Sequence, residues 1–297
     1  MHETIWTNLL WFINARFRIG RLFGVLVTIN YSLISIPIAI AVYCWPDFRL
    51  IIALMSFCLG IAASLLFHEM CHAWAGHYLG YRVREIGLLP IGGYTLLRKR
   101  SGTRWDDFFI SLAGPLGNGM ICVGLVALEI GLLDGDITAR LCQTIELLYG
   151  DDATIEGLPF LVVWANAVLR INVILLIFNL IPAFPLDGGR ALRTILSHVW
   201  TERHTGVITM WVSRTIAFGV AVCTLVDAII GTGSPIDILI VLPMSALIWY
   251  VSGMEVMRSM SKACVNSTEV CTAVKWSDYP AKKEAQPACA EYVVAVQ

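Results

Sequence analysis

Long apolar runs separated by short polar segments make up most of this chain. The apolar runs cover residues 31–45, 50–78, 108–133, 160–181, 207–230 and 236–257. About 20 consecutive, mostly apolar residues are enough to cross a bilayer as one helix. The pattern therefore predicts an all-α polytopic membrane protein with about six transmembrane helices.

The segments outside these runs predict smaller elements. Residues 86–97 carry the Gly and Pro punctuation of two short strands joined by a turn, so a small membrane-associated β-hairpin is expected there. Residues 1–17 are amphipathic and are followed by arginines, which favours an interfacial helix over a signal peptide. Residues 22–29 are a candidate short strand or re-entrant piece. The predicted parts are an interfacial segment at 1–21, a membrane-embedded domain at 22–257 and a polar tail at 258–297.

Composition agrees with a membrane protein. The chain is 57% hydrophobic and 14% charged, whereas soluble proteins are usually about 45–50% apolar. The formal net charge is −1 and the sequence has no basic domain, which argues against a nucleic-acid partner. The nine cysteines are scattered without a CxxC pair, which argues against a disulfide framework.

The loop charges predict an orientation. Lysines and arginines gather before the first predicted helix, between the second and third, between the fourth and fifth, and after the sixth. Segment 134–157 is acidic, with a single arginine at Arg140. Because loops rich in Lys and Arg stay in the cytosol, both termini are predicted to be cytosolic in a multi-pass protein of the cell membrane.

The run at 50–78 contains ionisable residues, which are unfavourable inside a membrane helix and so mark a candidate functional site. His68 and His72 stand about 40° apart around a helix, and Glu69 lies about 100° from His68, beside the pair. Satisfied core residues are the alternative interpretation, but each group would then carry an uncompensated desolvation penalty. A zinc ion bound by both histidines, with Glu69 as general base, removes that penalty.

A catalytic zinc ion normally takes three protein ligands. His77 lies about 180° around the helix from His68 and would point away. Glu85 sits beside a Gly-rich turn, where a solvated charge is expected. Asp187 is the stronger candidate, because it follows the fourth predicted helix on the cytosolic side. Proline and glycine flank it and favour the irregular backbone that lines cavities at membrane depth, although an interfacial turn aspartate is the alternative interpretation.

Several motifs occur in order between about residues 20 and 193. They are His68-Glu69-x-x-His72, Gly92-Gly93-Tyr94, Gly114-Pro115-Leu116-Gly117-Asn118, Asn179-x-x-Pro182 and Leu186-Asp187-Gly188. Together they resemble the site-2 protease family of intramembrane zinc metalloproteases. The resemblance implies that His68, His72 and Asp187 bind one zinc ion and that Glu69 is the general base. It also implies that Asn179 and Asn118 contact substrate or polarise the scissile carbonyl.

These observations predict an intramembrane zinc endopeptidase that hydrolyses peptide bonds within or near the transmembrane segments of membrane proteins. Its expected partners are single-pass or other transmembrane proteins and membrane lipid, and the sequence defines no oligomeric state. Residues 91–97 are the candidate edge to which an unwound substrate adds, so Gly93 and Tyr94 are candidate substrate-binding residues. The alternative function is a metal-binding membrane protein without protease activity, either a transporter or a substrate-binding pseudoprotease.

Overall fold

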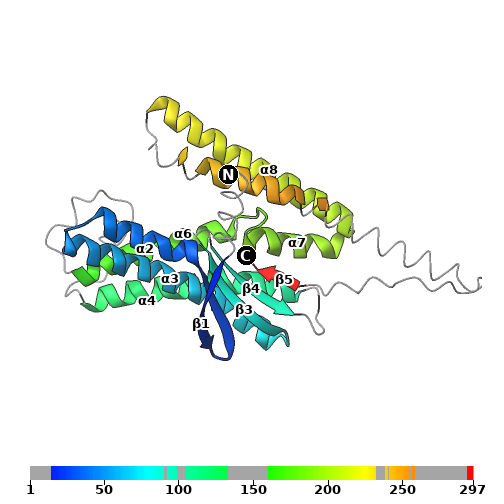
Figure 1. Cartoon of the computed structure of the whole chain (residues 1–297). Helices are drawn as coiled ribbons and strands as arrows, with labels where there is room; N and C mark the ends of the chain where they lie inside the picture. Colours follow the sequence, from blue (N-terminus) through cyan, green and yellow to red (C-terminus); the bar gives the residue numbers. More distant parts are fainter. Residues whose placement is uncertain are drawn as a thin grey trace, which may run out of the picture. The chain divides into compact units, whose positions relative to one another are not determined.

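The computed structural model of the chain describes residues 15–89, 92–98, 103, 105–132, 160–231, 238–239, 241–254, 256–257 and 293–296 (Figure 1). The chain divides into two compact units. The first unit comprises Met1–Gly102, Ile110–Asn179 and Val293–Gln297, and the second comprises Thr103–Phe109 and Leu180–Tyr292.

Five strands of the first unit form one sheet, in the order β1, β2, β3, β4, β5 (Figure 1). Their bounds are Arg16–Leu22 for β1, Val25–Asn30 for β2, Arg82–Leu89 for β3, Gly92–Arg98 for β4 and Val293–Val296 for β5. β2 and β3 run parallel, and the other neighbouring pairs are antiparallel. The predicted hairpin is present as β3 and β4, but it belongs to a larger sheet than the sequence predicted.

The β1–β2 hairpin begins inside the segment that the sequence predicts to be helical. In β1, Phe17 and Ile19 alternate with arginine and glycine, a period of two that suits a strand. The turn has positive φ at Phe23 (50°) and Gly24 (84°), as a two-residue type I′ turn requires. For residues 22–29 the sequence left a short strand or a re-entrant piece open, and the structure has the strand β2 over most of that segment. Residues 1–14 of the predicted interfacial helix lie outside the described residues.

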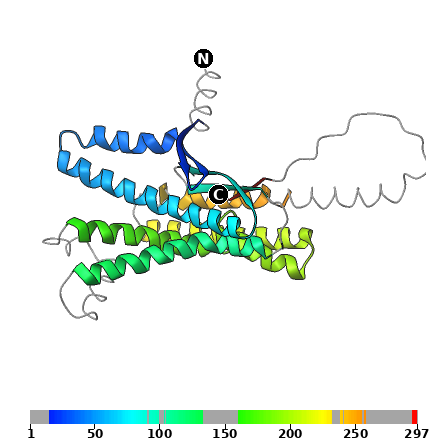
Figure 2. The ribbon, with the colours of Figure 1, turned by 90° about the horizontal axis from the view of Figure 1, so that it is seen from below.

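The first unit also contains four apolar helices, which lie side by side in Figures 1 and 2. They are α2 (Tyr31–Tyr43), α3 (Phe48–Tyr78), α4 (Asp106–Leu132, whose first turn belongs to the second unit) and α6 (Phe160–Leu180). α3 packs on β3 and β4. It also contacts α6, because Asn172 Nδ2 donates a hydrogen bond to Ser64 Oγ at 2.9 Å. Gly60 sits so close to α6 that a Cβ there would lie 2.7 Å from Val168 Cγ2. Small residues and an interhelical hydrogen bond are typical of helix packing in membranes.

Three of the described helices are long and apolar enough to cross a membrane, namely Phe48–Tyr78, Asp106–Leu128 and Glu202–Ile230. Shorter apolar helices cover Leu33–Tyr43, Trp164–Leu180 and Val241–Met254. The mostly helical, membrane-spanning class is as the sequence predicts, whereas the number of six spans stays a prediction. The acidic segment at 134–157 lies outside the described residues.

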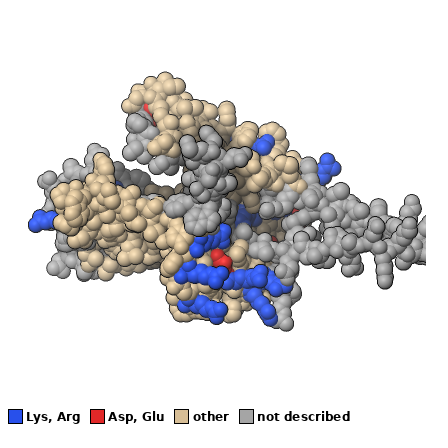
Figure 3. Space-filling model, viewed as in Figure 1, with Lys and Arg blue, Asp and Glu red and all other residues tan. Residues whose placement is uncertain are grey.

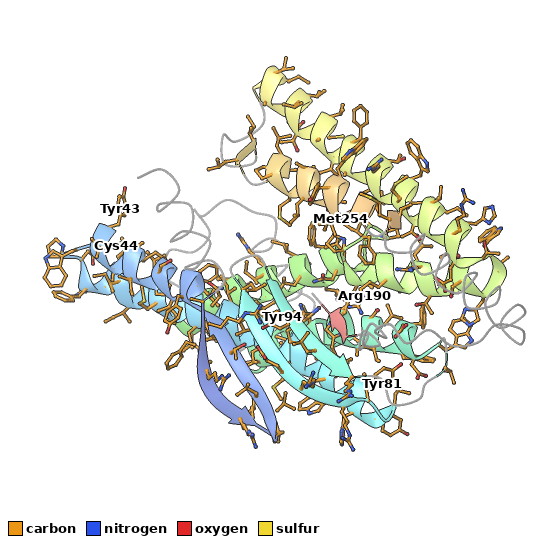
Figure 4. The ribbon with its side chains drawn as sticks, turned by 45° about the vertical axis from the view of Figure 1, so that its right-hand side comes forward. Tyr43, Cys44, Tyr81, Tyr94, Arg190 and Met254 are labelled. Atoms are coloured by element: carbon orange, nitrogen blue, oxygen red, sulfur yellow. The ribbon has the colours of Figure 1, made fainter. Side chains whose placement is uncertain are left out.

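The second unit contains α7 (Asp187–Val199), α8 (Glu202–Ile230) and the helix Val241–Met254. The sequence did not predict α7, because charged residues such as Arg190 (Figure 4) suggested a loop between two spanning helices. α8 packs on the helix Val241–Met254 through Arg214, whose guanidinium carbon lies 4.8 Å from the centre of the Trp249 ring.

Candidate active site

Helix α3 brings three ionisable side chains to one buried place. The exposed fraction is 4% for His68, 2% for Glu69 and 0% for His72. Nε2 of His68 and Nε2 of His72 are 3.1 Å apart, and the two rings meet edge to face. The spacing of four residues therefore places both imidazoles together, as the sequence predicts.

Helix α4 offers an acceptor oxygen to Nδ1 of both rings. Nδ1 of His72 lies 2.6 Å from the carbonyl oxygen of Ile110, and because a carbonyl only accepts, this Nδ1 carries the proton. Nδ1 of His68 likewise lies 3.3 Å from Oδ1 of Asn118. With Nδ1 turned to α4, Nε2 is the nitrogen of each ring that is available as a ligand, and the two Nε2 atoms lie 3.1 Å apart. Two imidazole nitrogens side by side are donors that suit a metal ion such as zinc.

Two glycines of α4 leave room for the side chains of α3. A Cβ on Gly114 would lie 2.4 Å from His72 Nε2 and 2.5 Å from His68 Nε2. A Cβ on Gly117 would lie 2.4 Å from Sγ of Cys71. α4 thus approaches the imidazoles more closely than a residue with a side chain would allow.

Strand β4 contacts the candidate general base. Oγ1 of Thr95 donates a hydrogen bond to Oε2 of Glu69 at 2.8 Å and lies 3.1 Å from the Glu69 carbonyl oxygen. A Cβ on Gly93 would lie 2.6 Å from Glu69 Oε1. Gly93 and Thr95 are two positions apart and share one face of the strand. This face of β4 therefore holds the Glu69 carboxylate.

The second unit carries Asp187, the buried first residue of α7. The chain turns sharply before it, because a Cβ on Gly188 would lie 2.4 Å from two backbone carbonyl oxygens. A carboxylate suits this position, since the helix N-terminus favours negative charge. Together with His68 and His72, this buried aspartate gives, among the described residues, a set of ligand types that could hold a metal ion.

Tyr94 lies on the opposite face of β4 from Thr95, on the sheet (Figure 4). Its hydroxyl donates to Glu85 Oε1 at 2.7 Å and accepts a hydrogen bond from Arg16, which also lies over the ring. Thr28 donates to the same Glu85 oxygen at 2.8 Å. Burial and the hydrogen bond to Glu85 raise the pKa of Tyr94. Glu85 thus belongs to this Tyr94 cluster, within a strand, and not to the solvated loop that the sequence suggested.

The other candidates take different positions. Asn179, near the end of α6, donates to the carbonyl oxygen four residues earlier in its own helix. His77 is exposed, as expected for a residue that does not bind the metal. Asn118 is buried, and its Oδ1 accepts from a candidate metal ligand. Roles in substrate binding stay predictions for Asn179, Asn118, Gly93 and Tyr94.

Sequence reasoning missed three contacts at this site. The carbonyl of Ile110 has no sequence signal, because every residue carries one. Gly114 belongs to a quoted motif, and its spacing of four from Asn118 could have placed both on one face of a helix. Thr95 follows Gly93 by two positions, and strand alternation could have placed it on the same face.

The fold and the site define a class, namely helical membrane proteins with a buried metal site formed by two histidines of one helix. Residues 56–222 match Peptidase family M50, and the chain belongs to this family. The resemblance to the site-2 protease family is therefore confirmed.

Two curated relatives have names that agree with the zinc expectation. The chain is 34% identical over 134 residues to zinc metalloprotease MJ0392 of Methanocaldococcus jannaschii, which is 45% of this chain and 32% of that protein. It is 28% identical over 211 residues to sll0528 of Synechocystis sp., named as a candidate zinc metalloprotease. The matched residues cover 66% of this chain and 48% of the relative. The chain thus spans about half the length, or less, of these relatives.

A solved structure shares the fold. The site-2 protease from Methanocaldococcus jannaschii matches with a TM-score of 0.51 and 22% sequence identity, over 82% of this chain and 95% of that chain. The names of the relatives and the group of His68, His72 and Asp187 both agree with the predicted zinc ion.

Proposed function

We propose that the protein is an intramembrane zinc endopeptidase, which hydrolyses peptide bonds within or near transmembrane segments of membrane proteins. The observation that carries the proposal is the facing pair of Nε2 atoms of His68 and His72, with the Glu69 carboxylate beside them on the same buried stretch of α3. Membership of Peptidase family M50 supports it.

Four side chains have proposed roles. His68, His72 and Asp187 hold one zinc ion, which supplies Lewis acidity when it is bound. Glu69 takes a proton from the attacking water on a carboxylate oxygen and passes it to the leaving amine. Because all four side chains are buried, the site excludes bulk water, which strengthens the electrostatic interactions within it.

The substrate proposed is a single-pass or other transmembrane protein whose helix unwinds locally and adds as a strand to the outer edge of β4. An unwound segment in lipid would leave backbone groups unsatisfied, and a strand edge would satisfy them. The antiparallel pairing of β4 with β5 supports this, because it places an extended segment along that edge, with Thr95 opposite Val296 and Arg98 opposite Val293. Gly93 and Tyr94 lie on the strand that would contact the substrate.

The proposed orientation places the sheet and both termini on the cytosolic side. Arginine side chains gather over the sheet in Figure 3, and the exposed ones include Arg18, Arg21, Arg82, Arg84 and Arg98. The positive-inside rule favours a cytosolic position for such a surface. In a variant without native cysteines, Arg98→Cys should resist an impermeant thiol reagent added outside the cell. Labelling from outside would reverse the orientation.

The experiment that tests the proposed function measures bound zinc and peptide cleavage in the same preparations. The purified protein is reconstituted in vesicles with a labelled single-pass peptide, an apolar segment with a central glycine. Glu69→Gln keeps the size of the side chain and removes the base, so zinc should stay bound while cleavage disappears. Cleavage by a zinc-loaded Glu69→Gln variant would overturn the proposal.

The same preparations test the third ligand. Asp187→Ala should lower the zinc content, because the ion loses a charged ligand. His77→Ala is the matched control, since His77 is exposed and should leave the zinc content near normal. The opposite ranking would exclude Asp187 as a ligand.

A further inference from the structure

Thr95 is a buried polar residue in contact with Glu69. Its side chain is 0% exposed and lies between the sheet and α3. Oγ1 is 2.8 Å from Glu69 Oε2 and 3.1 Å from the Glu69 carbonyl oxygen. A threonine hydroxyl carries one proton, so the shorter distance identifies the carboxylate oxygen as the main acceptor.

We propose that Thr95 is a positioning residue for the general base, with its hydroxyl holding Oε2 of Glu69 so that the carboxylate is oriented for proton transfer through Oε1. This inference rests on the proposed function, because it requires Glu69 to act as the base. Thr95 acts through Glu69 and does not itself contact the reacting atoms.

The physical argument concerns the freedom of the glutamate side chain. Glutamate has three side-chain torsions, so its carboxylate is fixed only where neighbouring groups contact it. Thr95 holds one oxygen by a hydrogen bond, and Gly93 gives the other oxygen room, since a Cβ there would lie 2.6 Å from Oε1. Both contacts come from one face of β4, so the strand helps to orient the carboxylate. A base must lie within hydrogen-bond reach of the proton that it removes.

Two substitutions of Thr95 distinguish a positioning role from a role in packing alone, because the two roles predict opposite results. Valine nearly matches the volume of threonine but lacks the hydroxyl, whereas serine keeps the hydroxyl and lacks a methyl group. If Thr95 only fills space between the sheet and α3, Thr95→Val should work as well as wild type and Thr95→Ser should be the weaker variant. If Thr95 positions Glu69, Thr95→Ser should restore the activity that Thr95→Val loses.

The test compares the two variants with wild type on the labelled single-pass peptide. Thr95→Val should lower kcat by about 10-fold to 100-fold, within the contribution of general acid–base catalysis. KM and zinc content should stay within about twofold, because neither the strand edge nor the histidines change. Thr95→Ser should recover kcat to within a few-fold of wild type. Equal kcat for Thr95→Val and wild type would overturn the inference.

A matched control and a spectroscopic measurement complete the test. Thr28→Val removes another threonine–glutamate hydrogen bond in the same sheet, 2.8 Å long and directed from buried Thr28 to partly exposed Glu85, so it should leave kcat unchanged. The infrared difference spectrum between wild type and Thr95→Val should contain a carboxylate band that disappears when both carry Glu69→Gln. Absence of that band would contradict the hydrogen bond itself.

The outcomes separate the two claims. If Glu69→Gln still cleaves the peptide, the proposed function fails whatever Thr95 does. If Glu69→Gln is inactive while Thr95→Val resembles wild type, the proposed function stands and only the role of Thr95 fails.

Discussion

Replacing Gly114 with alanine would place a methyl carbon against both imidazoles of the site. The added Cβ would lie 2.4 Å from His72 Nε2 and 2.5 Å from His68 Nε2. A carbon atom normally approaches such an atom to about 3.5 Å, so the rings or the helix must move by about 1 Å. The ring of His72 has little freedom to withdraw, because its Nδ1 donates to Ile110 on the same helix as Gly114.

The expected consequence is a loss of function that is larger than the loss of stability. Overpacking costs about 1–3 kcal/mol, and the better helix propensity of alanine offsets up to about 1 kcal/mol of that, so the variant should still fold. A displacement of about 1 Å at reacting groups can reduce the rate by about 100-fold. We therefore expect Gly114→Ala to lose zinc affinity and to cleave the single-pass peptide about 100-fold more slowly.

The assay measures zinc per protein and the cleavage rate in one preparation, beside a control from the same helix. A Cβ on Gly124 would meet no atom within 4 Å, so Gly124→Ala changes helix propensity without crowding the site. This control should keep normal zinc and activity and gain up to about 1 kcal/mol of stability. If Gly114→Ala binds zinc and cleaves as Gly124→Ala does, α4 does not approach the imidazoles as described.

Two further predictions concern the sheet. Deleting residues 293–297 removes β5, the strand that pairs with the outer edge of β4. If β5 and the substrate compete for that edge, the deletion should speed up cleavage of the single-pass peptide. Unchanged or slower cleavage would argue against this competition. Burial and the hydrogen bond to Glu85 raise the pKa of Tyr94 above its unfolded value of about 10. The stability that the Tyr94 hydroxyl contributes is therefore complete below a pH of about 10 and is lost as the pH rises through the folded pKa. Tyr94→Phe should therefore remove an alkaline step from the tyrosinate absorption titration, and an identical titration would contradict the Tyr94 cluster.

The long apolar helices and the placement of His68 and His72 on one helix face follow from the sequence, because both depend on local periodicity. The run at 50–78 predicted a membrane helix, and the structure has Phe48–Tyr78 there. His68 and His72 meet because a spacing of four residues is a property of the helix itself. The β3–β4 hairpin was likewise visible from its Gly and Pro punctuation.

Tertiary structure decided the elements whose partners are distant in sequence. β1 has the alternation of a strand, but only pairing with β2, and the pairing of β2 with β3, make it part of a sheet. The segment of α7 was expected to be a loop because of its arginines. In the structure it is a short amphipathic helix whose first residue is Asp187.

The environment of each functional side chain also came from tertiary structure alone. The tautomers of the histidines depend on Ile110 and Asn118, which lie on another helix. The orientation of Glu69 depends on Thr95, which lies 26 positions later in the chain on a strand. A sequence pattern gives the direction of a side chain relative to its own element. The carbonyl or hydroxyl that the side chain contacts, and the glycine that leaves room for it, depend on how separate elements pack. This packing leaves no periodic pattern in the sequence.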